Sequence, residues 1–155
     1  MKNRKPINEL IRDIIEAKRF AVLATESDGQ PHASLMAVTA ANDDKKLIFA
    51  TYRSTRKYTN LIQNGKVAIL FENKSIIDTN ENEIHVLTAF GNAAEVNTEE
   101  DEIYRQLHLL RHPELEFFLL NSDCAIFIVT VDAYQVVTGI DELIWWKTDG
   151  SASTD

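Results

Sequence analysis

The sequence predicts an α+β fold in which an antiparallel β-barrel of six to seven strands is flanked by helices. Two observations indicate this. Along the 155 residues, apolar positions alternate between helical three- and four-residue spacing and short compact runs typical of strands. The first three compact runs are separated by short polar turns, which favour antiparallel neighbours over parallel strands joined by helices.

The first predicted element is an amphipathic helix over residues 7–18, where one apolar stripe is flanked by charged positions. A strand over 20–25 follows, and Ser27-Asp28-Gly29-Gln30 then predicts a tight hairpin, because glycine after aspartate readily adopts positive φ. Strands over 32–40 and 47–51, with a polar turn between them, complete a meander.

Helical spacing returns over residues 55–64, where Asn64-Gly65 predicts a left-handed helix end. A strand over 67–71 and a longer one over 84–96 follow, and Gly91 predicts a bulge or a kink in the latter. The polar segment 78–83 between them is expected to be a flexible connection.

The last third of the chain predicts two helices and two strands. Thr98-Glu99-Glu100-Asp101 resembles a capping box at the start of a helix that runs to Leu110, and a short helix is expected over 113–120. Strands over 124–131 and 134–138 would close the barrel, the first so apolar that both of its faces should be buried. We expect one domain over 1–149 and a disordered tail over 150–155, which lacks apolar anchors.

Composition narrows the function classes. The formal net charge of -8 and the pI near 5.0 disfavour general binding to nucleic acid or anionic membranes. No apolar run approaches the roughly 20 residues of a membrane span, and charged residues interrupt the apolar positions after the basic N-terminus, unlike a secretory signal. The single cysteine, Cys124, is predicted to be a buried core residue. A cytoplasmic location is expected.

The most informative segment for chemistry is 50–60, a strand end followed by a helix start. It gathers Arg53, Arg56 and Lys57 with the hydroxyls of Thr51 and Thr55, a donor set that suits a phosphate monoester. The alternative is a solvated first helical turn whose cations pair with surface carboxylates. No GxGxxG or GxxxxGK[ST] motif occurs, so an α/β nucleotide-binding domain is unsupported.

Several weak motifs occur together in one order. They are Phe20-Ala-Val-Leu-Ala-Thr25, Gly29-Gln-Pro-His-Ala-Ser34, Leu47-Ile-Phe-Ala-Thr51, Ser54-Thr-Arg-Lys57, Asn60-Leu61, Val67-Ala-Ile-Leu70 and Leu87-Thr-Ala-Phe-Gly-Asn-Ala-Ala-Glu95. This set resembles the pyridoxamine 5'-phosphate oxidase-like FMN-binding split-barrel family, over about half the chain. The resemblance implies a split β-barrel that works as a homodimer, with FMN in a cleft between the two subunits.

The resemblance also implies site residues. Ser34, Leu35, Met36 and Ala37 would lie along the isoalloxazine ring and offer mostly backbone hydrogen bonds. Ala50 and Thr51 would also contact the cofactor, with Thr51 beside the ring or the ribityl chain, and Thr55, Arg56 and Lys57 would hold the phosphate. Trp145 and Trp146 would cover the ring from the partner subunit, or serve only as anchors of the dimer interface.

Departures from the family pattern argue against pyridoxamine phosphate oxidase activity itself. Ser34 stands where the oxidases carry an arginine, their glutamine is missing near His85 and Val86, and Leu143-Ile-Trp-Trp-Lys147 replaces their Arg-x-His segment.

The favoured hypothesis is an FMN-dependent oxidoreductase that passes hydride or electrons between a nicotinamide donor and a small substrate. The alternatives are a non-catalytic flavin carrier or sensor, and a related barrel that uses haem or the deazaflavin F420. No catalytic side chain is identified and no metal site is expected, because His108 and His112 lack an HExxH glutamate and read as positions on a solvated helix. His32 and His85 read as packed or locally bonded strand residues that could reach a flavin edge.

Overall fold

The computed structural model describes residues 5–41, 44–73, 84–138, 142–150 and 152–154. The helices are α1 (Ile7–Ala17), α2 (Arg56–Gln63), α3 (Thr98–Arg111) and α4 (Glu116–Leu120), with a 3-10 turn at Pro113–Leu115 before α4. The strands are β1 (Phe20–Ser27), β2 (Gln30–Ala37), β3 (Thr39–Ala41), β4 (Lys46–Tyr52), β5 (Lys66–Glu72), β6 (Val86–Glu95), β7 (Cys124–Val137), β8 (Leu143–Lys147) and β9 (Ala152–Thr154).

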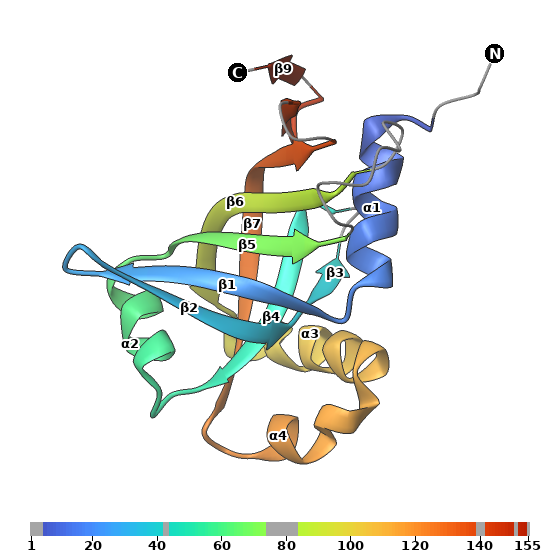
Figure 1. Ribbon diagram of the computed structural model, residues 1–155. Helices are drawn as coiled ribbons and strands as arrows, with labels where there is room; N and C mark the ends of the chain where they lie inside the picture. Colours follow the sequence, from blue (N-terminus) through green and yellow to red (C-terminus); the bar gives the residue numbers. More distant parts are fainter. Residues whose placement is uncertain (1–4, 42–43, 74–83, 139–141, 151, 155) are drawn as a thin grey trace.

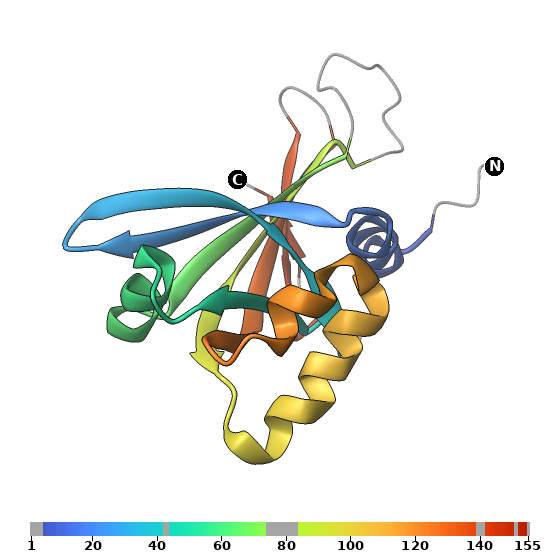
Figure 2. The ribbon, with the colours of Figure 1, turned by 90° about the horizontal axis from the view of Figure 1, so that it is seen from below.

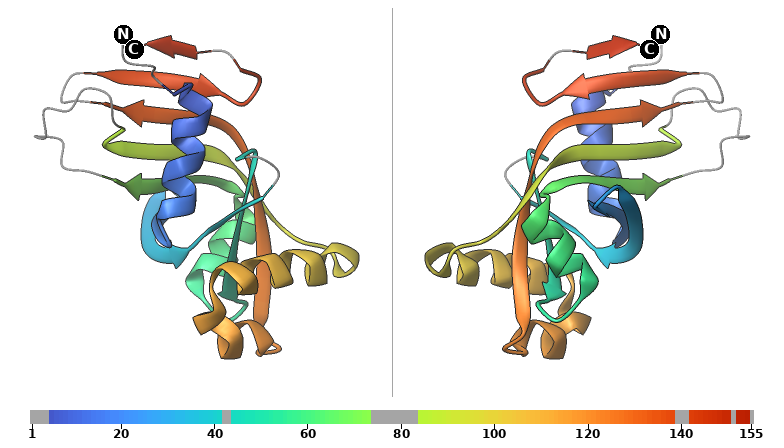
Figure 3. Two further views of the ribbon diagram at one scale, coloured as in Figure 1. Left: turned by 90° about the vertical axis from the view of Figure 1, so that its right-hand side faces the viewer. Right: turned by 90° about the vertical axis from the view of Figure 1, so that its left-hand side faces the viewer.

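One curled antiparallel sheet forms the body of the protein (Figures 1 and 3). Its strands follow the order β2-β1-β5-β6-β7-β4-β3, and β8 and β9 extend it beyond β7. The chain passes directly from β2 at one edge into β3 at the other, so the sheet closes on itself as a half-barrel. The predicted α+β antiparallel split barrel is therefore confirmed.

Two apolar cores stabilise the sheet, one on each side of β4 and β7. The main core lies inside the curled sheet, where α1 buries Ile11, Ile14 and Ile15. A smaller core lies outside it, where α3 and α4 pack on buried residues such as Ile48 and Ile126 (Figure 2). The first half of β7 is thus buried on both faces, as its apolar composition predicted.

Two predicted strand divisions differ from the structure. The single strand expected over 32–40 is two, because the chain changes partner at Val38: β2 pairs with β1, and β3 pairs with β4. The two strands expected over 124–138 are one, because β7 continues past an extra residue. Val131 pairs with Gly91 and Ala133 with Phe90, which leaves Asp132 bulged out of the ladder.

Glycines sit where the backbone requires them. Asp28 and Gly29 have φ of 51° and 81°, so the predicted hairpin between β1 and β2 is confirmed. The irregularity predicted at Gly91 is confirmed as a register shift between Phe90 and Gly91, although the extra residue is on β7, and a Cβ at Gly91 would clash with the Thr130 carbonyl oxygen. The left-handed helix end at Asn64-Gly65 is wrong: α2 ends in extended backbone at Asn64, and Gly65 instead makes room for the Ala93 carbonyl.

The remaining differences lie at segment ends. The cap of α3 is Asn97 rather than Thr98, and its side chain accepts a hydrogen bond from the Glu100 N–H at 3.0 Å. In the segment 150–155, expected to be disordered, the described residues include the short strand β9, which pairs with β8 through backbone groups and so needs no apolar anchor. The expected flexible connection 78–83 lies outside the described residues.

Candidate functional site

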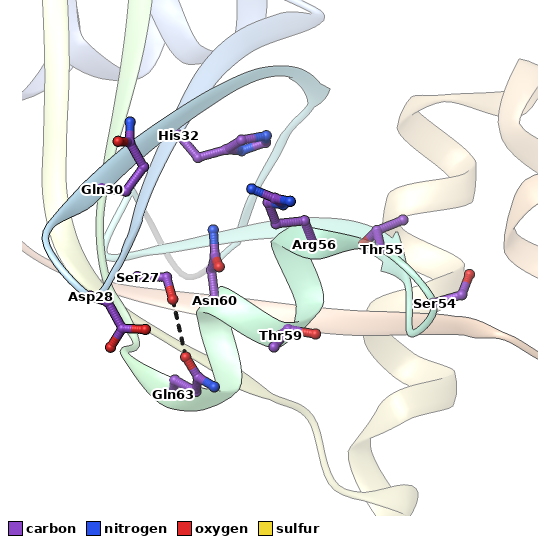
Figure 4. Close-up of a pocket in the computed structure, with 10 residues that line it drawn as sticks. All are labelled: Ser27, Asp28, Gln30, His32, Ser54, Thr55, Arg56, Thr59, Asn60 and Gln63. Atoms are coloured by element: carbon purple, nitrogen blue, oxygen red, sulfur yellow. Dashed lines mark hydrogen bonds between the residues drawn. The ribbon is translucent and has the colours of Figure 1, made fainter.

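A polar pocket of about 540 Å³ lies between the β1–β2 hairpin and helix α2 (Figure 4). The residues that line it are Ser27, Asp28, Gln30 and His32 from the hairpin, Ser54 and Thr55 before the helix, and Arg56, Thr59, Asn60 and Gln63 from α2. The helical residues follow the spacing i, i+3, i+4 and i+7, which places them on one face of α2.

Backbone geometry makes the start of α2 a donor site. The Thr55 side chain caps the helix by accepting a hydrogen bond from the Tyr58 N–H. The N–H groups of Arg56 and Lys57 make no hydrogen bond within the described part of the chain. Free N–H groups in the first turn and the positive end of the helix dipole both favour an anion.

The three cations predicted for this corner have different surroundings. Arg56 lines the pocket and is exposed, and it has no hydrogen-bond or ion-pair partner among the described residues. Lys57 is half-buried on a neighbouring part of the helix and does not line the pocket. Arg53 lies outside the pocket, where its guanidinium contacts Glu95 at 2.7 Å and the Ser122 carbonyl at 3.2 Å.

Arg53 belongs to a cluster that fixes the corner. Glu95, at the end of β6, accepts hydrogen bonds from Arg53 and from the Tyr58 hydroxyl at 2.9 Å. The shared carboxylate raises the pKa of both donors, because it stabilises their protonated forms. These hydrogen bonds fix helix α2 against the end of β6. Of the three predicted cations, Arg56 is the one that faces the pocket.

The hydroxyls of Thr51 and Thr55 are occupied within the protein. Their Oγ1 atoms lie 3.0 Å apart, and the Thr55 hydroxyl donates to the Tyr52 carbonyl oxygen at 2.8 Å. Thr51 is buried and lies outside the pocket lining. These side chains shape the corner where β4 meets α2.

Strand β2 carries unsatisfied polar groups next to the pocket. In the described residues β2 pairs only with β1, so it is an edge strand with unpaired backbone groups along its free side. The Ser34 Oγ and His32 Nδ1 atoms are buried and have no hydrogen-bond partner among the described residues. Such atoms are costly to bury alone, so they mark a place where a ligand could complete the hydrogen bonding.

The other predicted site residues are more dispersed. Leu35 points outward and is 69% exposed, whereas Met36 is buried in the main core and Ala37 is half-buried at the end of β2. Ala50 packs in the outer core beneath α4. Trp145 lies on β8 against Phe90, with ring centres 5.2 Å apart, and so is separated from β2 by the intervening strands of the same sheet.

The histidines of α3 are not on a solvated face. His108 and His112 are almost fully buried, with ring centres 5.0 Å apart, because this side of α3 packs onto β3 and the Val38 crossing. The His108 Nδ1 lies 2.7 Å from the Thr39 hydroxyl, and the His112 Nε2 lies 3.0 Å from the Val38 carbonyl oxygen. Within the described residues no group of three or more His, Cys, Asp or Glu side chains could hold a metal ion.

Sequence reasoning did not group the hairpin residues or the helix face with the phosphate site. The sequence pattern gives no indication that Gln30, Asp28 and Gln63 belong to the site, and it predicts His32 only as an isolated strand residue. The signal for the helix face was present in the polar residues at 56, 59, 60 and 63. The hairpin contribution required tertiary information, because only folding brings the turn next to the end of α2, where the Ser27 hydroxyl bonds the Gln63 amide oxygen at 3.1 Å.

The fold and the pocket define an antiparallel split barrel with a pocket of polar residues at the start of a helix. A sequence model of the pyridoxamine 5'-phosphate oxidase family matches residues 7–112, more than half of the chain. The chain belongs to this family. Comparison with curated protein sequences gives no significant match.

Solved structures share the fold at low identity. A heme binding protein from Mycobacterium smegmatis superposes with a TM-score of 0.78 and 18% identity, over 99% of this chain and 60% of that one. General Stress Protein 26 from Bacillus anthracis superposes with a TM-score of 0.67 and 18% identity, over 96% of this chain and 98% of that one. An FAD-binding protein from Mesorhizobium loti superposes with a TM-score of 0.62 and 11% identity, over 79% of this chain and 88% of that one. The chain therefore spans three fifths of the length of the Mycobacterium smegmatis protein.

Among the described helices, none is long and apolar enough to cross a membrane.

Proposed function

We propose that the protein binds FMN, with the phosphate at the first turn of α2 and the isoalloxazine ring along β2, and that it works as an FMN-dependent oxidoreductase. The observation that carries the proposal is the unpaired Arg56 guanidinium, which faces a polar pocket beside two free N–H groups at residues 56 and 57. A phosphate dianion satisfies all three donors at once.

The residues of β2 fit the flat part of the cofactor. The free edge of the strand offers backbone donors and acceptors, and the unpartnered Ser34 Oγ lies within the segment 34–37 expected to follow the ring. A flavin ring carries carbonyl and ring-nitrogen atoms that match such groups. The bound flavin would supply the electron transfer, whereas the chain's residues bind it, orient it and keep water from its buried side.

A homodimer is part of the proposal. Val22 pairs with Leu35 on β2 and with Leu70 on β5, so the three side chains form an apolar row across the outer face of the sheet. Leu35 and Leu70 are 69% and 39% exposed. Covering this row with a second copy removes apolar surface from water and places a partner next to β2, where Trp145 of that copy could reach the ring.

Haem is the second candidate, and one observation favours it. His32 lines the pocket and its Nδ1 has no partner, so its imidazole could ligate iron. The fold also resembles that of a heme binding protein. The residues that line the pocket are all polar, which suits a phosphate and a ribityl chain better than a porphyrin, and for that reason FMN is preferred.

The absorption spectrum of the purified protein, recorded before and after addition of FMN, separates these candidates. We expect the two visible bands of oxidised flavin, and bleaching of both when NADH or NADPH is added. A flavin spectrum that no nicotinamide donor bleaches would indicate a carrier or sensor in place of an oxidoreductase. A single intense band near the violet end of the spectrum would indicate haem.

Substitution of the pocket cation tests the phosphate site. Arg56→Ala should raise the FMN dissociation constant by about 10- to 100-fold, because a charge-assisted hydrogen bond contributes roughly 1.5–3 kcal/mol. Lys57→Ala should have a smaller effect, because Lys57 does not line the pocket. Lys147→Ala, on β8, is the matched control and should leave FMN binding unchanged. Equal FMN affinity in all three variants would contradict the assignment.

A further inference from the structure

Helix α3 exposes large apolar side chains and buries polar ones. Ile103, Leu107 and Leu110 are 62%, 42% and 82% exposed. Their spacing of four and three residues places them in one line along the helix, here called the α3 stripe. The opposite side of α3 packs on β3, β4 and β7, and it buries His108 and most of the Arg105 side chain. The helix therefore keeps its three large aliphatic side chains away from the core of its own chain.

The described part of the chain leaves the α3 stripe largely uncovered. Figures 2 and 3 show α3 at the periphery of the molecule, with the sheet on one side of it. Helix α4 approaches α3 at Arg105, whose guanidinium donates to the Leu119 carbonyl oxygen. Arg105 is two residues after Ile103, which is nearly the opposite side of a helix with 3.6 residues per turn. The neighbouring helix therefore does not shield the stripe.

The spacing of the α3 stripe indicates the shape of what would cover it. Apolar residues at positions i, i+4 and i+7 form the ridge with which one helix packs against another. A contiguous group of exposed aliphatic side chains is also a feature of interaction surfaces rather than of ordinary solvated helices. An α-helix is the element that fits this surface best.

The charges beside the α3 stripe indicate the chemistry of the partner. Glu99 and Glu100 lie in the first turn of α3, both are exposed, and neither has an ion-pair partner among the described residues. Glu99 is four residues before Ile103 and Glu100 three residues before it, so the two carboxylates flank the line of the stripe on its two sides. One end of the stripe is therefore acidic.

The cations of α3 are held toward the protein. Arg105 pairs with Asp101 at 2.9 Å, and the Arg111 guanidinium donates to the Glu16 carbonyl oxygen at the end of α1. A second copy of the chain would bring the same acids and a net charge of -8, and an anionic lipid surface would be repelled as well. Charge complementarity therefore favours a basic partner.

We propose that the α3 stripe docks an amphipathic helix of another protein, one that carries lysine or arginine beside its own apolar face. The apolar face of the partner would lie on Ile103, Leu107 and Leu110. In an antiparallel arrangement, basic side chains in its last turn reach Glu99 and Glu100, and the two helix dipoles oppose each other favourably. This surface is separate from the pocket at α2 and does not depend on the proposed flavin site.

Two synthetic peptides of the same leucine and lysine composition serve as probes. In one, the leucines recur at three- and four-residue spacing and so form one face of a helix, whereas in the other the same residues have no helical periodicity. Fluorescence anisotropy of the labelled peptides at physiological ionic strength measures their binding to the purified full chain. We expect the helical peptide to bind at least about tenfold more tightly, because it alone presents an apolar face with basic flanks.

Substitutions in the α3 stripe locate the contact. Ile103→Ala and Leu110→Ala should each weaken binding of the helical peptide about fivefold or more, because each removes a large apolar contact from the interface. Both positions are exposed, so the folded chain tolerates the change. Ile62→Ala is the matched control: Ile62 is 57% exposed on α2, outside the pocket lining, and its loss should leave peptide binding unchanged.

A charge substitution tests the acidic end. Glu100→Gln should weaken binding of the helical peptide and reduce its dependence on salt, because it removes one of the carboxylates that the lysines face. Glu9→Gln removes an acid from the first turn of α1 instead and should change neither property.

The alternative occupants give different results. Equal binding of the two peptides, or unchanged affinity in Ile103→Ala and Leu110→Ala, would show attraction through net charge alone and would overturn the proposal. A lower molar mass of Leu110→Ala in light scattering would assign the α3 stripe to a second copy of the chain. Binding to phosphatidylcholine vesicles that is lost in Leu110→Ala would assign the stripe to a lipid surface. Either of the last two results would likewise overturn the proposal.

Discussion

At the residue scale, the three cations near the start of α2 show why local charge density is an incomplete guide to a site. Sequence spacing brings Arg53, Arg56 and Lys57 together, but it contains no information about the partner of each. Glu95 lies on β6, more than 30 residues away in the sequence. Its carboxylate forms an ion pair with Arg53 at 2.7 Å, so this guanidinium does not face the pocket. Arg56 alone of the three lines the pocket, because its position in the first turn faces the hairpin.

His108 provides a residue-scale prediction about stability. Burial, together with the smaller effect of the neighbouring His112, lowers the pKa of His108 to about 3, whereas Glu114 acts in the opposite direction. The unfolded chain binds a proton here below about pH 6.5 and the folded protein does not. The contribution of His108 to the free energy of unfolding should therefore be fully present above pH 6.5 and be lost as the pH falls toward 3.

The size of this effect follows from linkage. Each pH unit below 6.5 should cost up to about 1.4 kcal/mol of unfolding free energy from this residue. Urea unfolding at pH 7 and pH 5 measures the loss, and His108→Asn should show a shallower pH dependence than the unmodified chain. The same slope in both proteins would show that His108 is not the group responsible.

At the element scale, the two faces of the hairpin formed by β1 and β2 carry different kinds of side chain. The inner face carries His32 and Ser34 toward the pocket, because strand residues two apart share a side. The outer face carries Leu35 in the apolar row with Val22 and Leu70. A shift of one residue in the pairing of β2 would exchange these faces, so the turn at Asp28 and Gly29 determines which side chains face the pocket and which face outward.

The outer face gives a prediction about assembly. Leu35→Lys should shift the protein from dimer to monomer, because a lysine in the apolar row would bury a charge without a partner. Light scattering after size-exclusion chromatography measures the molar mass. Leu110→Lys, at an 82% exposed position on α3, is the matched control and should leave the mass unchanged. Dimers in both variants would place the interface elsewhere.

At the scale of the whole molecule, sequence periodicity was sufficient for the fold class because each element carries its own apolar pattern. The junctions were not predictable from that pattern. The chain changes partner at Val38 without a break in the run of strand-forming residues, and β7 continues past the bulged Asp132. Both features depend on which strand lies alongside, and only the closed sheet determines that.

The part of the candidate site that is local in sequence was predictable, and the part that depends on strand pairing was not. The corner between β4 and α2 is local in sequence, so the Thr55-Arg56-Lys57 segment could be identified from residue types. The opposite wall, formed by the hairpin, comes from residues some 30 positions earlier that reach α2 only through the pairing of β1 with β5. The free edge of β2 likewise became visible only with the strand order.

The claim on which this account depends most is that the pocket recognises a phosphate ester through Arg56 and the first turn of α2. The difference in dissociation constant between FMN and riboflavin, which lacks the phosphate, tests it most directly. We expect FMN to bind at least about tenfold more tightly, since the phosphate gains a charge-assisted hydrogen bond of roughly 1.5–3 kcal/mol. Equal affinity for the two flavins would contradict the account.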